Sequence, residues 1–538
     1  METLSKLLRE VDMNRSRLLL MLIIAALGTT MTIAVVNMAL MREDGGDTFM
    51  LAMVFLLSII VYSSAQRSVM AECAKAAELM IAHQRRSILE ATRAADYASL
   101  QRIGRAPIYK AVTQETQTIS NTLPLIVVGA QQSVVLVFMA FYVAYLSMFA
   151  FAIIGLFGIF TVWFHITRLN RLGERMQALK GTQNRLFTAF RGMLAGVKEI
   201  AFNEARGLDV VAELRTQSDE TRVNTARIKR HWAIQYVGMQ TLFYILLGVM
   251  VFVVPMFTET YHDVVIQSTM AALFMIGPLS SLAQGIPAVN DTTRALSNIH
   301  ALNDQLRASA QVADDEQALS TDRHPHTLTL DGVGYTFRDS HNQPTFTLHP
   351  TDATFHRGKI AFITGGNGSG KSTLFRLMTG IVHPDVGHFL LDQVQVPSDG
   401  FGAYRDRIGV VFSDYYLFRT LVGLGDIDPA AVSELLARFE LTDKVKLVDG
   451  GFTTTDLSAG QRKRLALIAA ILQDPPVLML DEWAADQDPH FRKVFYRDIL
   501  PSLAAEGRII ICITHDEQYF DVADALYAMA DGRMSKVR

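Results

Sequence analysis

Apolar residues gather in the first 300 positions of the chain, in stretches long enough to cross a lipid bilayer. A helix needs ~20 predominantly apolar residues to span the bilayer core. Six stretches approach or exceed that length: 18–40, 49–65, 123–145, 148–166, 233–257 and 264–283. A buried helix of a soluble protein would explain any one of them. Six together, with almost no charge inside, predict an α-helical membrane domain of six spans.

Lysine and arginine are distributed unequally over the segments that join these stretches. Residues 66–120 hold eight of them, residues 167–232 hold thirteen, and residues 1–17 hold four. The loops on the opposite side hold one, Arg42. Because basic residues favour the cytoplasmic side of a membrane, both termini and both long segments are predicted to be cytoplasmic. The long segments are rich in helix formers, so the helices are expected to continue beyond the bilayer, over 74–93 and 186–214.

The pattern changes after position 300. Residues 1–300 form the predicted membrane domain, and the polar residues 301–325 predict a linker. Short β-rich runs then alternate with helical stretches, at 327–330, 360–364, 407–412, 477–480 and 509–514. This alternation predicts a cytoplasmic α/β domain at 326–538.

Composition argues against nucleic-acid binding and against a structural or metal-binding role for the cysteines. Half of the residues are hydrophobic, and a net charge of −3 gives no support for binding nucleic acid. Cys73 and Cys512 lie far apart in segments of different kinds. We therefore expect neither a disulfide framework nor a cysteine metal cluster.

The sequence ITGGNGSGKST overlaps the end of the predicted strand 360–364 and fits the P-loop pattern G-x-x-x-x-G-K-[ST]. Its glycines let successive backbone N–H groups close around a phosphate chain, and a helix N-terminus adds positive potential. In this pattern Lys371 reaches the β- and γ-phosphates of ATP, and the Ser372 hydroxyl binds Mg²⁺. The predicted ATP-binding residues here are Gly365, Gly366, Asn367, Gly368, Ser369, Gly370, Lys371, Ser372 and Thr373.

A second apolar run, 477–480, ends in two carboxylates within PVLMLDEWAADQDP. A strand ending in a solvated acidic turn would also give this pattern. With a P-loop upstream, Asp481 is predicted to hold Mg²⁺ and Glu482 to orient or deprotonate the attacking water. Two weaker signals are LSAGQ at 457–461, at the start of a predicted helix, and His515 just past the last strand.

The set GGNGSGKST, LSAGQ, LMLDE, AADQD and ITHD behind six spans resembles an ATP-binding cassette (ABC) exporter half-transporter over essentially the whole chain. The resemblance implies that two copies pair as a homodimer. Each ATP would lie between the P-loop of one copy and the LSAGQ signature of the other. Ser458, Gly460 and Gln461 would then lie near the γ-phosphate bound by the partner copy.

The same resemblance implies further roles. Asp488 would be the aspartate of the D-loop, the segment after the two carboxylates, and His515 the switch histidine that acts in catalysis with Glu482. Phe337 lies where an aromatic residue stacks on adenine. The cytoplasmic helices would end in coupling helices near 97–105 and 203–213.

Two departures from the general ABC pattern narrow the family. Ser413 stands where most cassettes have a glutamine in the Q-loop, and Trp483 follows Glu482 in place of a small residue or proline. Serine is too short to bind Mg²⁺ without loop movement, so we expect a water to fill the gap. Asp414 is the alternative, disfavoured because a carboxylate beside Asp481 and Glu482 would raise the repulsion.

Four segments, FSDYYLF, LSAGQRKRLAL, DEWAADQDP and GVKEIAFNEAR, together resemble the cyclic-peptide and siderophore-peptide exporters of Gram-negative bacteria. That group handles syringomycin-type lipopeptides, pyoverdine precursors and lasso-peptide microcins. The favoured hypothesis is therefore ATP-driven export of a peptide-like compound across the inner membrane. The alternatives are a lipid or glycolipid flippase and an ATP-binding regulatory subunit with little turnover. The full set of ATPase residues disfavours the regulatory subunit.

Overall fold

A computed structural model describes residues 15–40, 48–257, 262–309, 324–338, 343–398, 400–425 and 427–538. The chain forms two compact units. One comprises the residues up to Glu90 together with Ala106–Asp304, and the other comprises Ala91–Arg105 and Gln305–Arg538. The short segment Ala91–Arg105 thus belongs with the C-terminal unit although it lies within the helical part of the sequence.

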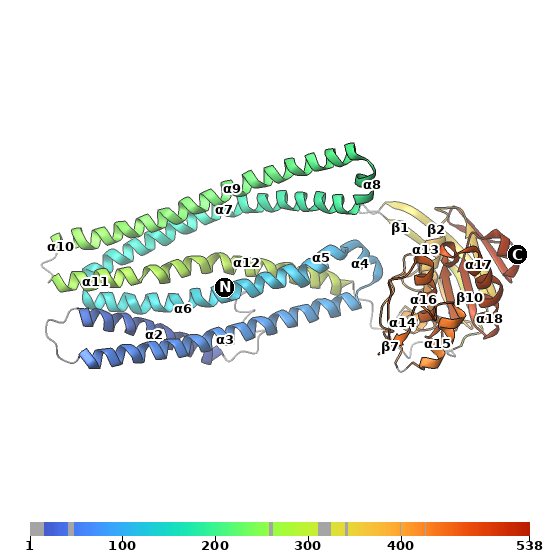
Figure 1. Cartoon of the computed structure of the whole chain (residues 1–538), viewed down its shortest axis with the longest axis horizontal. Coiled ribbons are helices and arrows are strands. Elements are labelled where there is room, and N and C mark those ends of the chain that lie inside the picture. Colours follow the sequence, from blue (N-terminus) through green and yellow to red (C-terminus); the bar gives the residue numbers. More distant parts are fainter. Residues whose placement is uncertain are drawn as a thin grey trace. The chain divides into compact units, whose positions relative to one another are not determined.

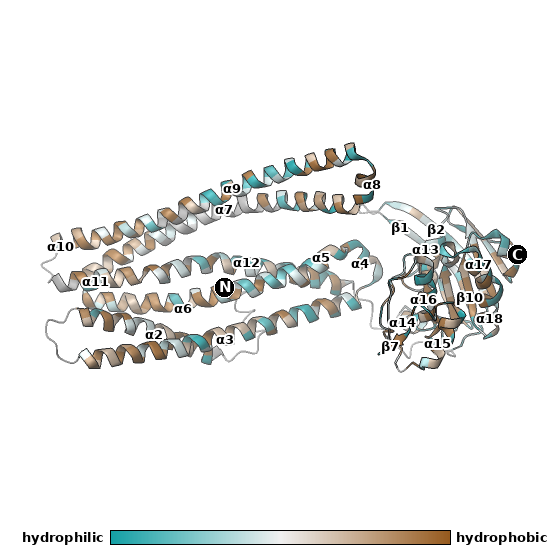
Figure 2. Ribbon diagram, viewed as in Figure 1, coloured by the Kyte–Doolittle hydropathy of each residue, from teal (hydrophilic) through white to brown (hydrophobic). Residues whose placement is uncertain are grey.

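Long helices make up the first unit (Figure 1). They are α2 (Arg15–Leu40), α3 (Thr48–Ala94), α6 (Thr116–Leu146), α7 (Met148–Ala195), α9 (Glu204–Gly248), α11 (His262–Phe274) and α12 (Ile276–Ala308). Shorter helices are α5 (Arg105–Lys110), α8 (Val197–Phe202) and α10 (Val254–Phe257), with π-helical turns at Ala111–Glu115 and Val249–Val253. The short helix α4 (Tyr97–Ile103) lies in the segment that belongs with the second unit. Figure 2 shows that apolar residues gather toward one end of the long helices and polar residues toward the other. This division fits helices that leave a bilayer and continue into water.

Four of these helical runs are long and apolar enough to cross a membrane: Ser16–Leu40, Thr48–Ala94, Arg105–Leu146 and Val265–Ala308. The predicted spans at 148–166 and 233–257 lie in α7 and in α9–α10. Within the described residues, their apolar helical stretches are shorter, at Met148–Thr161 and Gln240–Met256. All six predicted spans therefore fall in helices, and four of them meet the length and hydropathy expected of a span.

The second helical extension, predicted over 186–214, differs from its prediction. Residues 186–214 do not form one helix, because α7 ends at the cap residue Gly196. The short helix α8 follows, and the Asn203 side chain then caps α9 by accepting a hydrogen bond from the N–H of Arg206 at 3.1 Å. The short helix at this turn is Val197–Phe202 rather than 203–213. An asparagine N-cap starts a helix there, which the composition of the segment did not reveal.

The second unit is an α/β domain that contains the five β-rich runs predicted from the sequence. Its main sheet has the order β12-β11-β3-β10-β9-β6. The strands are β12 (Arg533–Lys536), β11 (Ala525–Ala530), β3 (Ile360–Gly365), β10 (Ile509–Ile513), β9 (Val477–Asp481) and β6 (Ile408–Val411). All neighbours are parallel except β11 and β12. The carboxyl ends of β3, β9, β10 and β6 therefore meet at one edge, where the predicted ATPase residues follow them.

A second, antiparallel sheet has the order β2-β1-β4-β5. Its strands are β1 (Thr327–Arg338), β2 (Pro344–His356), β4 (Val386–Leu391) and β5 (Val394–Gln395), and a hairpin joins β7 (Leu447–Val448) to β8 (Gly451–Phe452). The helices of this unit are α13 (Lys371–Met378), α14 (Phe401–Arg405), α15 (Pro429–Arg438), α16 (Ala459–Ile471), α17 (Pro489–Val494) and α18 (Leu500–Ala505). β9 and β10 are buried along their whole length, which matches their continuous apolar sequences.

Candidate functional site: an ATPase centre

The P-loop joins the end of β3 to the start of α13. Lys371 is 6% exposed, and its ammonium donates hydrogen bonds to the carbonyl oxygens of Gly365 and Gly366 at 2.8 and 2.9 Å. Gly370 has a φ of +103° and precedes the helix directly. A side chain at Gly365 would place its Cβ 2.3 Å from the carbonyl oxygen of Met529. The glycines are thus required by backbone conformation and by close packing.

The P-loop forms one wall of a pocket of about 320 Å³. The pocket is lined by Phe337, Phe346, Asn367, Gly368, Ser369, Gly370, Lys371, Ser372, Thr373 and Glu482. The Ser369 hydroxyl is buried and has no hydrogen-bond partner within the described chain. A phosphate oxygen would satisfy this donor, since buried polar groups are normally hydrogen-bonded.

Two aromatic rings reach this pocket from the second sheet. Phe337 lies in β1, and its ring meets the ring of Tyr335 edge-on with centroids 4.9 Å apart. Phe346 lies in β2, and its ring would stand 2.7 Å from a Cβ at Gly370. The resemblance to ABC exporters pointed to Phe337 but not to Phe346, which lies beside the P-loop glycine Gly370 in the folded domain.

Asp481 ends β9 and is 5% exposed. Burial raises the pKa of its carboxyl group, and a hydrogen bond from Ser413 opposes that rise. The Ser413 hydroxyl donates to Asp481 Oδ2 at 3.0 Å. Ser413 is therefore joined directly to the carboxylate that is predicted to hold the metal, while Asp414 is exposed.

Glu482 follows Asp481 and has a left-handed backbone, with φ +46° and ψ +38°. Its carboxylate oxygen Oε1 lies 3.4 Å from Nε2 of His515. His515 comes two residues after β10, and Ile513 is paired in register with Asp481. The sheet register thus brings together two residues that are 33 positions apart in the sequence.

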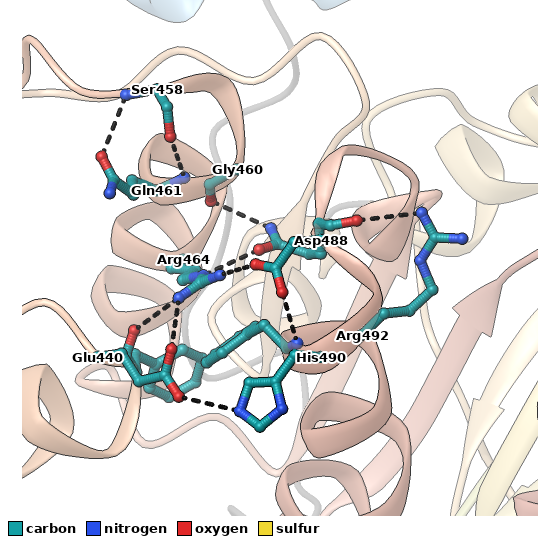
Figure 3. Close-up of polar contacts among 11 residues, drawn as sticks. Glu440, Ser458, Gly460, Gln461, Arg464, Asp488, His490 and Arg492 are labelled. Carbon is teal, nitrogen blue, oxygen red and sulfur yellow. Dashed lines mark hydrogen bonds and ion pairs between the residues drawn. The ribbon is translucent and has the colours of Figure 1, made fainter.

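The signature residues form a separate cluster at the start of α16 (Figure 3). Ser458 caps the helix, and its side chain and that of Gln461 each accept a hydrogen bond from the other's backbone N–H, both at 3.3 Å. A Cβ at Gly460 would lie 2.7 Å from the carbonyl oxygen of Asp486 in the D-loop. The Gln487 amide donates to the Gly460 carbonyl at 3.1 Å. The signature and the D-loop of the same copy are therefore packed against each other.

Arg464 reinforces this contact from the next turn of α16 (Figure 3). Its guanidinium is 9% exposed; it donates to Gln487 at 2.9 Å and to Asp488 at 2.8 Å, and forms an ion pair with Glu440 at 3.2 Å. It also lies 3.4 Å from the ring centre of Phe491. The carboxylate of Asp488 accepts a hydrogen bond from the N–H of Phe491, which lowers its pKa. Arg464 and Gln487 were missed from the sequence because their partners come from other elements.

The predicted site residues thus divide into two groups. Phe337, the P-loop and Glu482 share one pocket. His515 contacts Glu482, and Ser413 is hydrogen-bonded to the neighbouring Asp481. Ser458, Gly460, Gln461 and Asp488 are not among the residues that line this pocket. Their separation within one chain is what a site shared between two copies requires.

The polar residues within the spans occupy different environments. Asn37 is buried and donates to Tyr142 Oη at 3.2 Å and to the Gln267 carbonyl at 3.0 Å, so it joins α2 to α6 and α11. Gln131 is fully buried in α6. Gln240 and Tyr244 are exposed on α9.

Comparison with known proteins agrees with this architecture. A family model described as ABC transporter matches residues 348–485. The chain is 34% identical over 452 residues to ATP-binding protein SyrD of Pseudomonas syringae pv. syringae, which covers 80% of this chain and 78% of that protein. It is 29% identical over 282 residues to an ATP-dependent lipid A-core flippase of Cupriavidus metallidurans, covering 50% of this chain and 46% of that protein.

A solved structure of a bacterial Atm1-family ABC exporter with ATP bound has the same fold. It superposes with a TM-score of 0.74 at 17% sequence identity, covering 97% of this chain and 94% of that chain. The predicted architecture, a helical membrane domain fused to an α/β ATPase domain, is confirmed. The chain belongs to the ABC transporters, as a multi-pass membrane protein that couples ATP hydrolysis to transport.

Proposed function

We propose that the protein is an exporter of a peptide-like compound across the bacterial inner membrane, working as a homodimer with both termini in the cytoplasm. The observation that carries this proposal is the 34% identity with SyrD over 80% of the chain, which extends well beyond the ATPase domain. The motifs around Ser413, Trp483 and the signature resemble those of cyclic-peptide and siderophore-peptide exporters. The near absence of charge in the spans also favours an uncharged or weakly charged cargo.

In this proposal two copies enclose two ATP molecules. The P-loop residues of one copy bind the phosphates, with Lys371 at the β- and γ-phosphates and Phe337 against the adenine. Ser458, Gly460 and Gln461 of the other copy complete the site. The N-terminus of α16 favours an anion there, because its first N–H groups point outward.

Glu482 is the group that orients and deprotonates the attacking water. Its exposed carboxylate lies in the nucleotide pocket and 3.4 Å from His515, which can hold the carboxylate in place or contact the γ-phosphate. Lys371 stabilises negative charge that develops on the transferred phosphoryl group. The resulting closure and opening of the ATPase pair would switch the membrane domain between its two faces.

The residues predicted to hold the metal fit Mg²⁺. They supply oxygen ligands, the hydroxyl of Ser372 and the carboxylate of Asp481, which is the chemistry this ion prefers. A buried carboxylate is costly unless a cation balances it, and burial raises the pKa of Asp481. When bound, the metal would neutralise charge on the β- and γ-phosphates. Ser413 orients the Asp481 carboxylate for this role through its 3.0 Å hydrogen bond.

A lipid or glycolipid flippase is the second candidate. It is supported by the similarity to the lipid A-core flippase, which is lower in identity and covers half of this chain. A peptide and a lipid differ in the polar groups that the membrane domain must accommodate. The two candidates therefore differ in what should stimulate ATP hydrolysis.

The test uses the full-length protein reconstituted in lipid vesicles. ATPase activity is measured with a syringomycin-type lipopeptide, a lasso peptide and lipid A, each over a concentration series. Stimulation by a peptide, with ATP-dependent movement of the same compound across the vesicle membrane, would support the proposal. Stimulation and movement of lipid A alone would establish the flippase instead. The Glu482→Gln variant is the control for movement that does not depend on hydrolysis.

A further inference from the structure

A buried lysine lies directly behind the proposed catalytic glutamate. Lys463 comes from the second turn of the signature helix α16, and its side chain is 5% exposed. Its ammonium donates a hydrogen bond to the backbone carbonyl of Glu482 at 2.9 Å. The same nitrogen lies 2.7 Å from Oδ2 of Asp486 in the D-loop. A charge so deeply buried requires such partners, so the position of Lys463 is fixed by both contacts.

The backbone of Glu482 is in a conformation that an ordinary residue adopts only under constraint. Its φ of +46° is left-handed, which disfavours any residue with a Cβ. Its N–H donates to the Ile513 carbonyl at 3.1 Å, and its own carbonyl accepts from the N–H of Ala485 at 3.3 Å as well as from Lys463. Hydrogen bonds to Ile513 of β10, to Ala485 and to Lys463 therefore hold the backbone of Glu482 in place.

Trp483 forms a second hydrogen bond between the same two segments, from its side chain to the backbone of Lys463. Its indole N–H donates to the backbone carbonyl of Lys463 at 2.9 Å, and its ring is 1% exposed and stacked on Phe495 with centroids 4.2 Å apart. The second turn of α16 and the turn after β9 are thus joined by two reciprocal hydrogen bonds. A proline after the glutamate would restrict the backbone of position 482 by itself. Tryptophan imposes no such restriction, so here these tertiary contacts must hold the turn.

We propose that Lys463 is a positioning residue for ATP hydrolysis, which holds the backbone of Glu482 and links it to the D-loop through Asp486. Because the same ammonium touches both groups, a displacement of Asp486 changes the support of Glu482. The D-loop also contacts the signature turn at Gly460. A shift of the signature or of the D-loop, which would face the partner copy, would therefore move the turn that carries Glu482. This inference rests on the proposed role of Glu482 in activating water.

The competing explanation is that Lys463 only stabilises the domain. The two explanations differ in which measured quantity changes. Loss of a positioning contact lowers kcat while the affinity for ATP is kept, because the P-loop pocket is untouched. Loss of a purely stabilising contact lowers the midpoint of thermal unfolding and leaves the turnover of the folded protein intact.

The experiment uses the full-length protein in lipid nanodiscs, with ATP as the probe. The variants are Lys463→Met, Lys463→Arg, Asp486→Asn and the double variant Lys463→Met/Asp486→Asn. Lys536→Met, at an exposed lysine of β12, is the matched control. We expect kcat to fall about tenfold in Lys463→Met, with the KM for ATP within about twofold of the control. Lys463→Arg should recover part of the rate.

Asp486→Asn should lower kcat in the same direction, and it keeps the test valid should Lys463→Met fold poorly. The double variant should be no slower than Lys463→Met, because the two residues act through one contact. The inference would be overturned if Lys463→Met or Asp486→Asn had the same kcat as the Lys536→Met control. It would also be overturned if the loss of kcat in the double variant equalled the two single losses combined. Glu482→Gln tests the underlying role separately. The turnover of this variant must be lost. Normal turnover would overturn both the proposed role of Glu482 and the inference about Lys463.

Discussion

The hydroxyl of Ser413 donates a hydrogen bond to the carboxylate of Asp481 at 3.0 Å. Serine is shorter than the glutamine that most ABC transporters have in the Q-loop, and the sequence suggested a gap at this position. The structure joins Ser413 to the carboxylate that is predicted to hold Mg²⁺, and the water expected in the gap remains a prediction. The Q-loop of this protein therefore contacts the proposed metal site through Asp481.

Replacing Ser413 with alanine tests this link. The Asp481 carboxylate loses a hydrogen bond that orients it, so we expect the Mg²⁺ concentration for half-maximal ATPase activity to rise about three- to tenfold. The measurement is an ATPase titration with Mg²⁺ at saturating ATP. Ser433→Ala, whose hydroxyl donates to the Pro429 carbonyl within α15, is the control. An unchanged Mg²⁺ dependence would make Ser413 a bystander.

The Glu482→Gln variant should bind ATP and fail to hydrolyse it. Glutamine keeps the size of the side chain but cannot accept a proton from water, so kcat should fall by about 10²- to 10⁴-fold. Binding is measured with a fluorescent ATP analogue and turnover by phosphate release. Glu434→Gln, at an exposed position of α15, should behave like the unmodified protein. Near-normal turnover in Glu482→Gln would remove Glu482 from the mechanism.

The pKa of Asp481 predicts how stability depends on pH when Mg²⁺ is removed. Burial raises this pKa, so the folded protein holds the proton more tightly than the unfolded chain does. The stabilisation from protonation is complete below the unfolded pKa and is lost as the pH rises through the folded one. In EDTA at neutral pH, Asp481→Asn should therefore unfold a few degrees higher than the unmodified protein.

This difference should shrink as the pH is lowered, because Asp481 then becomes neutral as well. Thermal unfolding is followed by tryptophan fluorescence over a pH series. Asp498→Asn, at an exposed position, provides the comparison. A lower unfolding midpoint for Asp481→Asn in EDTA at neutral pH would contradict the assigned direction of the pKa.

Gly460→Ala should uncouple the signature from the D-loop. Its Cβ would lie 2.7 Å from the carbonyl oxygen of Asp486, so the two segments must separate. We expect kcat for ATP to fall by about 10- to 100-fold, as misplacement of catalytic groups by ~1 Å does elsewhere. ATP binding to the P-loop should survive. Gly192→Ala in α7, where a Cβ meets no atom of the described residues within 4 Å apart from its own helix backbone and chain neighbours, should leave kcat unchanged.

The sequence by itself determined the two-part architecture and most of the ATPase centre. Runs of apolar residues with almost no charge specify membrane helices because the bilayer admits little else. The P-loop and the Asp481–Glu482 pair were found because each is contiguous in sequence and lies at the end of an apolar strand. Local chemistry of this kind does not depend on distant parts of the chain.

The contacts between these motifs were decided only by the tertiary structure. Ser413 reaches Asp481 because β6 pairs with β9, and His515 reaches Glu482 because β10 lies beside β9. Lys463 looks like one more basic residue of an ordinary helix in the sequence, yet packing of α16 turns its ammonium toward the Glu482 carbonyl. Hydrogen bonds between elements depend on sheet register and helix packing, which no single segment encodes.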